Sequence, residues 1–212
     1  MTTKTRSKTT AKKTRSRTTK SQSTKKSGEN NEVSLHKLLE DNLKDMYSAE
    51  MQLVDALPEM AEAAHNTELE QAFTNHLEQT KTHFSRLEKI LEKLDIDTEK
   101  IEKCAAMEGL IKENKKLIEE YEESHIRDSA LIIGAQKIEH YEIAGYGSLC
   151  ELADVLGYSN LHDLLGQTLN EEETTDEELT EVAVAINDEA KEMSDGETEY
   201  EDENLSKGGN FK

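Results

Sequence analysis

The amino-acid sequence predicts an all-α protein, an antiparallel four-helix bundle with an additional C-terminal helix. One proline, no tryptophan and few aromatic residues accompany abundant Glu, Lys, Leu and Ala, a composition that favours helices over sheets. Apolar residues recur at helical spacing in five long segments, and the short links between these segments favour antiparallel neighbours. A chain of 212 residues is long enough for one domain with a substantial core.

The two ends of the chain differ in composition from the centre. Residues 1–28 carry ten Lys or Arg and no acid, whereas the rest holds 16 basic against 46 acidic residues. Residues 1–30 therefore read as a disordered basic arm rich in Ser and Thr, and residues 188–212 as a disordered acidic tail, since neither can bury enough apolar surface to fold alone. Residues 34–187 are left as the helical bundle.

The first two predicted helices place polar side chains on faces that should be buried. The first runs from about residue 35 to residue 65 with Ser34 as its N-cap, and Glu50 falls within its apolar stripe. The second runs from about residue 68 to residue 94, where His76 and His83 lie one heptad apart near the inner face. Glu78 points away from that face in an ideal helix, so only a local bulge would make it a ligand.

The remaining helices add three more inward glutamates. The third helix, about residues 98–123, has Glu108 at the centre of its stripe, and the fourth, about residues 126–156, is apolar nearly all round. Glu139 and Glu142 on the fourth helix are three residues apart, so both can reach one region, and Gly157 should end this helix. A fifth helix spans about residues 160–186, with the glutamates at 171–173 expected in solvent.

Inward glutamates on several helices require a cation. An unpaired buried carboxylate costs several kcal/mol or takes up a proton, so Glu50, Glu108, Glu139 and Glu142 together predict a pair of metal ions held between helices. The open alternatives are a stripe-edge glutamate that reaches water, and a helical scaffold whose interior glutamates share protons. A scaffold would have a melting temperature indifferent to chelators.

Other features concern location and partners. Cys104 and Cys150 lack a CxxC spacing and are expected as buried thiols, which fits a reducing cytoplasm, and no segment is long enough to span a bilayer. The basic arm leaves two readings open. Residues 1–28 either bind the phosphate backbone of nucleic acid through counterion release or act as a solubilising tail, and deleting them discriminates the two.

Four sequence runs carry a resemblance to a known family. DMYSAE (45–50), AFTNHLEQTKTHFSRLE (72–88), CAAMEGLIKE (104–113) and AQKIEHYEIAGYGSL (135–149) resemble the YciF-type bacterial stress proteins, the DUF892 family of the ferritin-like superfamily. The resemblance covers roughly residues 34–186. It implies a ferritin-like bundle, a dinuclear metal centre with iron as the expected metal, and a homodimer.

The ferritin-like superfamily pattern has a carboxylate on the first and third helices and a Glu-x-x-His motif on the second and fourth, and this chain departs from it. Three residues after Glu78 stands Lys81, and three after Glu139 stands Glu142. A lysine ammonium cannot replace a neutral imidazole, so His83 or His76 must supply any nitrogen from the second helix. The greater share of carboxylate makes Mn²⁺ an alternative to Fe²⁺.

The leading functional hypothesis is a cytoplasmic dinuclear-metal protein of stress defence that oxidises Fe²⁺ with peroxide or oxygen. The predicted ligands are carboxylates on four helices and one imidazole: Glu50, Glu78, His83, Glu108, Glu139 and Glu142. Tyr47 and Tyr146 flank this site, with packing as their default role. The alternative is a non-enzymatic DNA-binding or scaffold bundle that acts through its basic arm. Whether the protein turns over any substrate is left open by the sequence.

Overall fold

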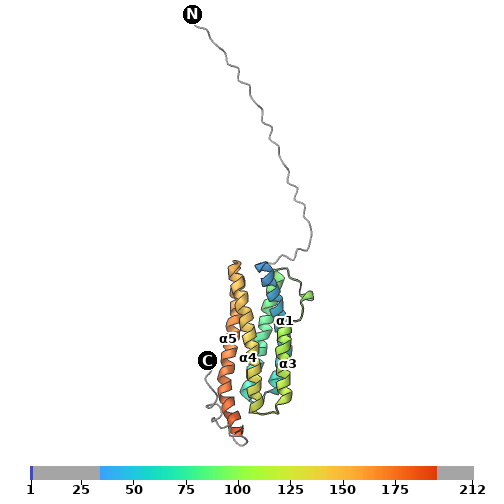
Figure 1. Ribbon diagram of the computed structural model, residues 1–212, viewed down its shortest axis with the longest axis vertical. Coiled ribbons are helices and arrows are strands. Elements are labelled where there is room, and N and C mark those ends of the chain that lie inside the picture. The colour runs from blue at the N-terminus through green and yellow to red at the C-terminus, as the bar shows by residue number, and fades with distance from the viewer. Residues whose placement is uncertain (2–33, 195–212) are drawn as a thin grey trace, which may run out of the picture. The chain divides into compact units, whose positions relative to one another are not determined.

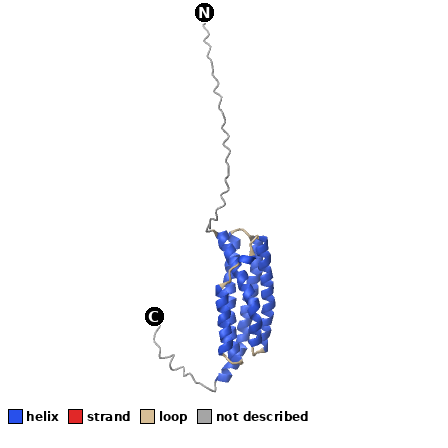
Figure 2. Cartoon of the chain, turned by 90° about the vertical axis from the view of Figure 1, so that its right-hand side faces the viewer, coloured by secondary structure: helices blue, strands red, loops and turns tan. Residues whose placement is uncertain are grey.

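Every regular element in the described part of the chain is helical (Figures 1 and 2). The structure, a computed structural model, describes Met1 and residues 34–194. The helices are α1 (Leu35–Ala63), α2 (Thr67–Lys93), a short 3₁₀ turn η1 (Thr98–Lys100), α3 (Ala105–Glu120), α4 (His125–Val155) and α5 (Ser159–Ser194). The all-α prediction is confirmed. The predicted basic arm beyond Met1 and residues 195–212 of the predicted acidic tail lie outside the described residues.

Local sequence signals set the ends of the helices. Ser34 caps α1 by accepting a hydrogen bond from the backbone N–H of Lys37 at 3.2 Å, and Asn66 caps α2 through the N–H groups of Glu68 and Leu69. Gly157 follows the end of α4 with a φ of 77°, a left-handed conformation that glycine adopts at little cost. The predicted N-cap of α1 and the predicted stop of α4 are therefore confirmed.

Contacts at the two ends of the bundle fix the directions of its helices. Asp128, in the first turn of α4, accepts hydrogen bonds from the N–H groups of His65 and Asn66 at 2.7 and 3.0 Å in the turn between α1 and α2. His36, at the start of α1, packs its ring edge-on against Tyr158 in the turn between α4 and α5. Helix α4 therefore runs antiparallel to α1 and parallel to α2.

Two parallel helices need a connection that returns along the bundle, and α3 lies within it. Helices α1, α2, α4 and α5 pack around a common interior, while α3 packs on the outside against α1 and α4 (Figure 1). One long crossover of this kind is typical of ferritin-like bundles. The helix that lies outside the central four is thus α3, and α5 is one of the four.

The third helix begins later than its apolar spacing suggests. Cys104 is its N-cap, and residues 94–104 form a turn at Leu94 and Asp95, the 3₁₀ turn η1 and irregular backbone instead of α-helix. The connection from α2 to α3 is consequently longer than the three residues expected from sequence, which allows the chain to turn back. At the other end of the chain, α5 continues to Ser194, past the predicted end at Ile186.

Two apolar clusters fill the interior on either side of a polar layer. One cluster includes Leu53, Leu57, Phe73, Leu131, Ile138 and Leu179, and the other Leu43, Met46, Leu87, Leu91, Leu149 and Leu165. Burying each such side chain contributes about 1.5–3 kcal/mol, and this stabilisation offsets the cost of the polar layer between the clusters.

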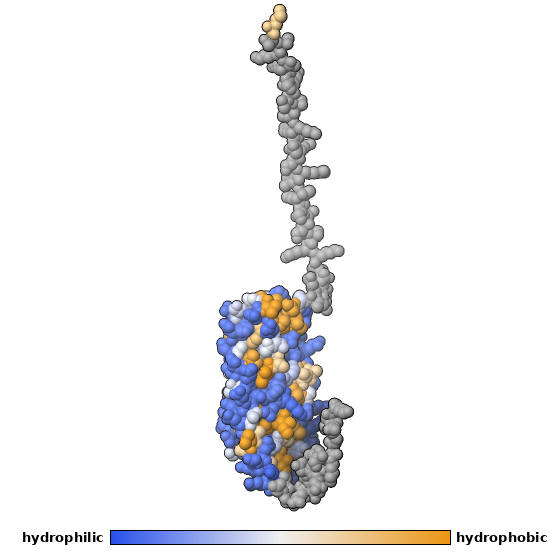
Figure 3. Space-filling view, turned by 60° about the vertical axis from the view of Figure 1, so that its left-hand side comes forward, coloured by the Kyte–Doolittle hydropathy of each residue, from blue (hydrophilic) through white to orange (hydrophobic). Residues whose placement is uncertain are grey.

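The outer faces of the bundle are largely polar. Figure 3 shows hydrophilic residues over much of one face, with smaller apolar patches between them. Cys104 and Cys150 are free and buried, as predicted. Among the described helices, none combines the length and the apolar composition that crossing a membrane requires.

Candidate metal centre

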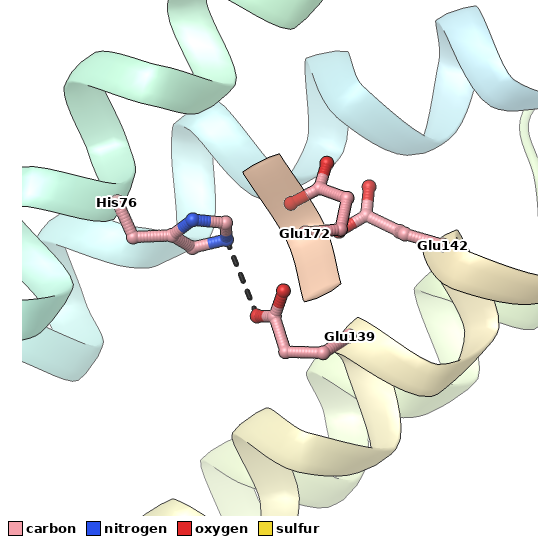
Figure 4. A group of neighbouring side chains, drawn as sticks. All are labelled: His76, Glu139, Glu142 and Glu172. Atoms are coloured by element: carbon pink, nitrogen blue, oxygen red, sulfur yellow. Dashed lines mark ion pairs between the residues drawn. The ribbon is translucent and has the colours of Figure 1, made fainter. Parts of the chain in front are cut away.

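The polar layer consists of six buried side chains contributed by the four central helices. Glu50 comes from α1, His76 and His83 from α2, Glu139 and Glu142 from α4, and Glu172 from α5. Each of them is at most 3% exposed. Figure 4 shows four of these side chains converging from three helices, with His76 directed toward Glu139.

The layer divides into two groups that share one residue. His76, Glu139, Glu142 and Glu172 offer ligand atoms that lie within 4.8 Å of one another, and Glu50, His83 and Glu172 do the same. Both groups combine imidazole nitrogen with carboxylate oxygen, donors that suit Fe²⁺, Mn²⁺ and Zn²⁺. This buried group can therefore hold a metal ion.

Several of these ligand atoms have no hydrogen-bond partner. Both oxygens of Glu142 and of Glu172 are buried and make no hydrogen bond, and the same holds for one oxygen each of Glu50 and Glu139. His83 Nδ1 lies 2.8 Å from Glu172 Oε1, and His76 Nε2 lies 3.2 Å from Glu139 Oε1, yet neither nitrogen makes a hydrogen bond of regular geometry. Each buried polar group left unpaired costs about 1–3 kcal/mol, more when it is charged. These atoms are oriented as a ligand set would be and lack any other partner among the described residues.

Burial and mutual repulsion alter how these groups titrate. Desolvation, followed by the charge of Glu172, raises the pKa of the Glu50 carboxyl to about 8. Desolvation and the charges of Glu50 and Glu172 raise the pKa of Glu142 well above its ordinary range. Burial opposes the charged form of His76, but nearby Glu139, Glu172 and Glu50 outweigh it and raise the pKa of that imidazole to about 9. The layer thus resists carrying its full negative charge without a cation.

Neighbouring side chains orient the layer. The Tyr146 hydroxyl, itself fully buried, donates a hydrogen bond to Glu50 Oε1 and leaves Oε2 unpaired. On the outer side of α4, the Tyr141 hydroxyl donates to Asp45 Oδ2 at 2.6 Å and lies 3.1 Å from Cys104 Sγ. Tyr146 therefore contacts a candidate ligand directly, whereas these hydrogen bonds of Tyr141 link α4 to α1 and to the start of α3.

A small cavity adjoins the layer. Its volume is about 10 Å³, and its lining includes His76, Glu139, Thr175 and the apolar side chains of Leu53 and Phe73. This is room for about one water-sized molecule. A small ligand in this cavity would lie directly against two of the candidate metal ligands.

The structure brings together four of the six side chains predicted from sequence and excludes two. Glu50, His83, Glu139 and Glu142 lie in the buried layer. Glu78 is exposed and pairs with Lys81 Nζ at 2.6 Å, in keeping with its outward phase on α2.

The inward position predicted for Glu108 is wrong. Its side chain is 57% exposed and pairs with Lys103 Nζ at 2.6 Å, and the same pairing holds its pKa below the usual range. The prediction assumed that Ile101 and Cys104 lie on the same helical face as Glu108, but the helix begins only after Cys104. The buried residues of α3 are Met107 and Asn114, which define a different face.

Glu172 is the candidate metal ligand that was not predicted from the sequence. The glutamates at 171–173 were expected in solvent, yet Glu172 is 0% exposed. A signal was present, since Glu172 stands seven residues after Leu165 and seven before Leu179, both of which are buried core residues. Heptad spacing between two core leucines places a side chain on the inner face of a helix.

The fold and the site define a class of protein: a ferritin-like helical bundle with a buried group of carboxylates and imidazoles. Comparison with known families agrees with this class. Residues 34–192 match the family described as "Domain of unknown function (DUF892)", and the chain belongs to that family.

Individual relatives and solved structures give the same result. Protein YciF of Escherichia coli strain K12 is 49% identical over 142 residues, which cover 67% of this chain and 86% of that protein. The crystal structure of the E. coli stress protein YciF matches with a TM-score of 0.71 at 44% identity, covering 74% of this chain and 99% of that one. YcfI from Rhodopseudomonas palustris matches with a TM-score of 0.68 at 37% identity, covering 72% and 97% of the two chains.

Proposed function

We propose that this protein binds two divalent metal ions between its four central helices and reacts Fe²⁺ with peroxide or oxygen. The observation that carries the proposal is the set of buried carboxylate oxygens and imidazole nitrogens that converge without hydrogen-bond partners. Four ionised carboxylates around two neutral imidazoles carry four negative charges, which two divalent cations would balance. The name of the relative YciF as a stress protein is consistent with this role.

The ligand roles follow from the two groups. His76, Glu139 and Glu142 would hold one ion, Glu50 and His83 the other, and Glu172, which belongs to both groups, would bridge them. Tyr146 keeps Glu50 in place through its hydrogen bond, and the apolar clusters on either side keep bulk water out. Iron or manganese bound here would supply one-electron redox chemistry and Lewis acidity. The adjoining cavity fits a reactant of about the size of water.

The first test is metal content after anaerobic loading with Fe²⁺, followed by removal of loosely bound metal. We expect about two ions per wild-type chain and fewer than one in Glu172→Ala, because both positions lose their shared ligand. The matched control is Glu173→Ala, which removes the adjacent exposed carboxylate and should keep two ions.

Stability provides a second readout on the same proteins. A ligand that binds only the folded state stabilises it, so a chelator should lower the melting temperature of the loaded wild type and leave Glu172→Ala unchanged. Wild-type protein that retains no metal, with a melting temperature indifferent to chelator, would leave a helical scaffold as the better account. Peroxide consumption by the Fe²⁺-loaded wild type then tests the proposed reaction.

A further inference from the structure

The two nitrogens of the His83 imidazole face different carboxylates. Nδ1 faces the metal layer, 2.8 Å from Glu172 and 3.7 Å from Glu50, while Nε2 lies 2.9 Å from Glu171 Oε2 on the outer side. The His83 side chain is only 1% exposed, whereas Glu171 is 38% exposed. The ring therefore spans from the buried layer to a carboxylate at the bundle surface.

Glu171 is itself fixed by an arginine. Arg86, one turn along α2 from His83, contacts both carboxylate oxygens of Glu171, at 2.8 Å from Nη1 and 3.3 Å from Nη2. Arg86 Nη1 also donates to the hydroxyl of Thr168 on α5. The Arg86 side chain is 14% exposed. A bidentate pair of this kind restricts the carboxylate to one orientation, even though Glu171 is partly in solvent.

The second histidine of the layer has a different outer partner. His76 Nδ1 lies 3.5 Å from the hydroxyl of Thr175, whose single proton has two acceptors in reach, Gln79 Oε1 at 3.3 Å and the backbone carbonyl of Glu171 at 3.1 Å. A hydroxyl is neutral and can rotate, so it neither charges nor fixes the ring as a carboxylate does. The two candidate metal positions thus differ in the groups behind their imidazoles.

We propose that Glu171, clamped by Arg86, is a positioning residue that keeps the proton of His83 on Nε2 and so presents the Nδ1 lone pair to the metal position shared by Glu50 and Glu172. Carboxylates that accept the outer N–H of a metal-binding histidine fix its tautomer and ring orientation and raise its basicity. The inference rests on the proposed function, because it concerns a ligand of the proposed centre. Neither Glu171 nor Arg86 is itself a ligand in this arrangement.

A purely structural role makes a different prediction. The Arg86–Glu171 pair also ties α2 to α5, so its loss would lower the stability of the whole bundle without favouring either metal position. A positioning role lowers the affinity of one ion and leaves the other in place. Affinity measured ion by ion separates the two roles.

The experiment is calorimetric titration of the metal-free full chain with Mn²⁺, a hard ion that oxygen and imidazole ligands hold. We expect Glu171→Ala to weaken one of two Mn²⁺ ions by about 10- to 100-fold and to leave the other near its wild-type affinity. Glu171→Gln keeps an acceptor for the Nε2 proton and should recover part of the loss. Glu173→Ala, the matched control, should change neither ion.

A second measurement reads the tautomer directly. Ring ¹⁵N shifts of His83 in protein loaded with diamagnetic Zn²⁺ should show a metal-bound Nδ1 and a protonated Nε2 in the wild type, and in Glu171→Ala a fraction of rings whose Nδ1 is free of metal. Two ions of unchanged affinity in Glu171→Ala, equal weakening of both ions, or an equal effect of Glu173→Ala would each overturn the positioning role alone. Wild-type protein that takes up neither Mn²⁺ nor Zn²⁺ would overturn it together with the proposed function.

Discussion

Glu50 illustrates how a buried carboxyl depends on its surroundings. Its pKa is raised to about 8 by burial and by the charge of Glu172, against an ordinary value of 4.5. His76 responds to the same negative surroundings with a pKa of about 9, against an ordinary 6.5. In the metal-free protein both residues therefore hold a proton more tightly when folded than when unfolded.

The metal-free protein should lose stability as the pH rises. A group whose pKa is higher in the folded state stabilises fully below its unfolded pKa, and this contribution is lost as the pH rises through the folded pKa. Loss begins above about 4.5 for Glu50 and above 6.5 for His76, and it continues to about pH 8 and 9, respectively. Thermal melts from pH 6 to pH 9 should show a falling melting temperature, by about 2–4 °C for each kcal/mol lost.

The metal-loaded protein should respond in the opposite direction over the same range. Metal binding requires deprotonated ligands, so added Mn²⁺ should stabilise more at pH 8 than at pH 6. Glu50→Gln, which cannot titrate at this position, should show a shallower slope without metal. A metal-free melting temperature that stays constant or rises with pH would contradict these shifted pKa values.

The difference between Glu172 and Glu108 shows what a sequence reveals about single residues. Glu50, Glu139 and Glu142 could be assigned inward because each lies within a long, uninterrupted helical stripe. Glu108 lies only four residues after the N-cap of its helix. The residues before that cap are not helical, so their spacing does not indicate which way Glu108 points. Glu172 was hidden by two flanking glutamates, although its own spacing from core leucines was regular.

At the scale of a helix pair, α3 packs closely on α4 because the Asn114 side chain occupies the space next to Gly134, which has no side chain. Asn114 of α3 is buried and donates its Nδ2 to the backbone carbonyl of Leu110 at 3.1 Å. Its Oδ1 lies where the Cβ of any residue other than glycine would project from Gly134 of α4. The absence of a side chain at this position lets the two helices approach closely.

Gly134→Ala should therefore destabilise the protein. The added methyl group overlaps the amide of Asn114, and overpacking of this kind costs about 1–3 kcal/mol. Urea unfolding of the metal-free protein measures the change. Gly147→Ala in the same helix is the matched control, because no atom lies within 4 Å of the new Cβ, and it should stabilise by about 0.5–1 kcal/mol. Equal effects of the two substitutions would show that Asn114 adjusts without cost.

Helix positions were more predictable than helix neighbours. The spacing of apolar residues located all five long helices, and the residue types Ser34 and Gly157 indicated where α1 begins and α4 ends, because these are local properties of the chain. The order of the helices around the interior depends on contacts such as those of Asp128 with the turn between α1 and α2, which no local pattern encodes. The exclusion of α3 from the metal layer follows from that order.

At the scale of the whole molecule, the basic arm and the acidic bundle are expected to have separate roles. Residues 1–28 hold ten positive charges and no negative one, so they either bind DNA by releasing counterions or act as a solubilising tail. If they bind DNA, deleting residues 1–28 should abolish a salt-sensitive gel shift of DNA and leave the metal content unchanged. A gel shift that survives the deletion would show that DNA binding does not depend on residues 1–28.

The layer of candidate ligands also joins the two halves of the chain. Glu50, His76 and His83 belong to the hairpin of α1 and α2, whereas Glu139, Glu142 and Glu172 belong to the hairpin of α4 and α5. Since α2 and α4 run in the same direction, the segment that contains α3 must return along the bundle to connect the two hairpins. Neither hairpin alone contains both groups of ligands.

This division has a consequence for a chain that is still on the ribosome. Glu50 and both histidines leave the exit tunnel long before Glu172, the residue that both groups require. A nascent chain can therefore expose isolated carboxylates and imidazoles but cannot assemble either complete position. Under the proposed function, uptake of the ions waits until α5 has left the ribosome, so metal would be bound only after both hairpins have been synthesised.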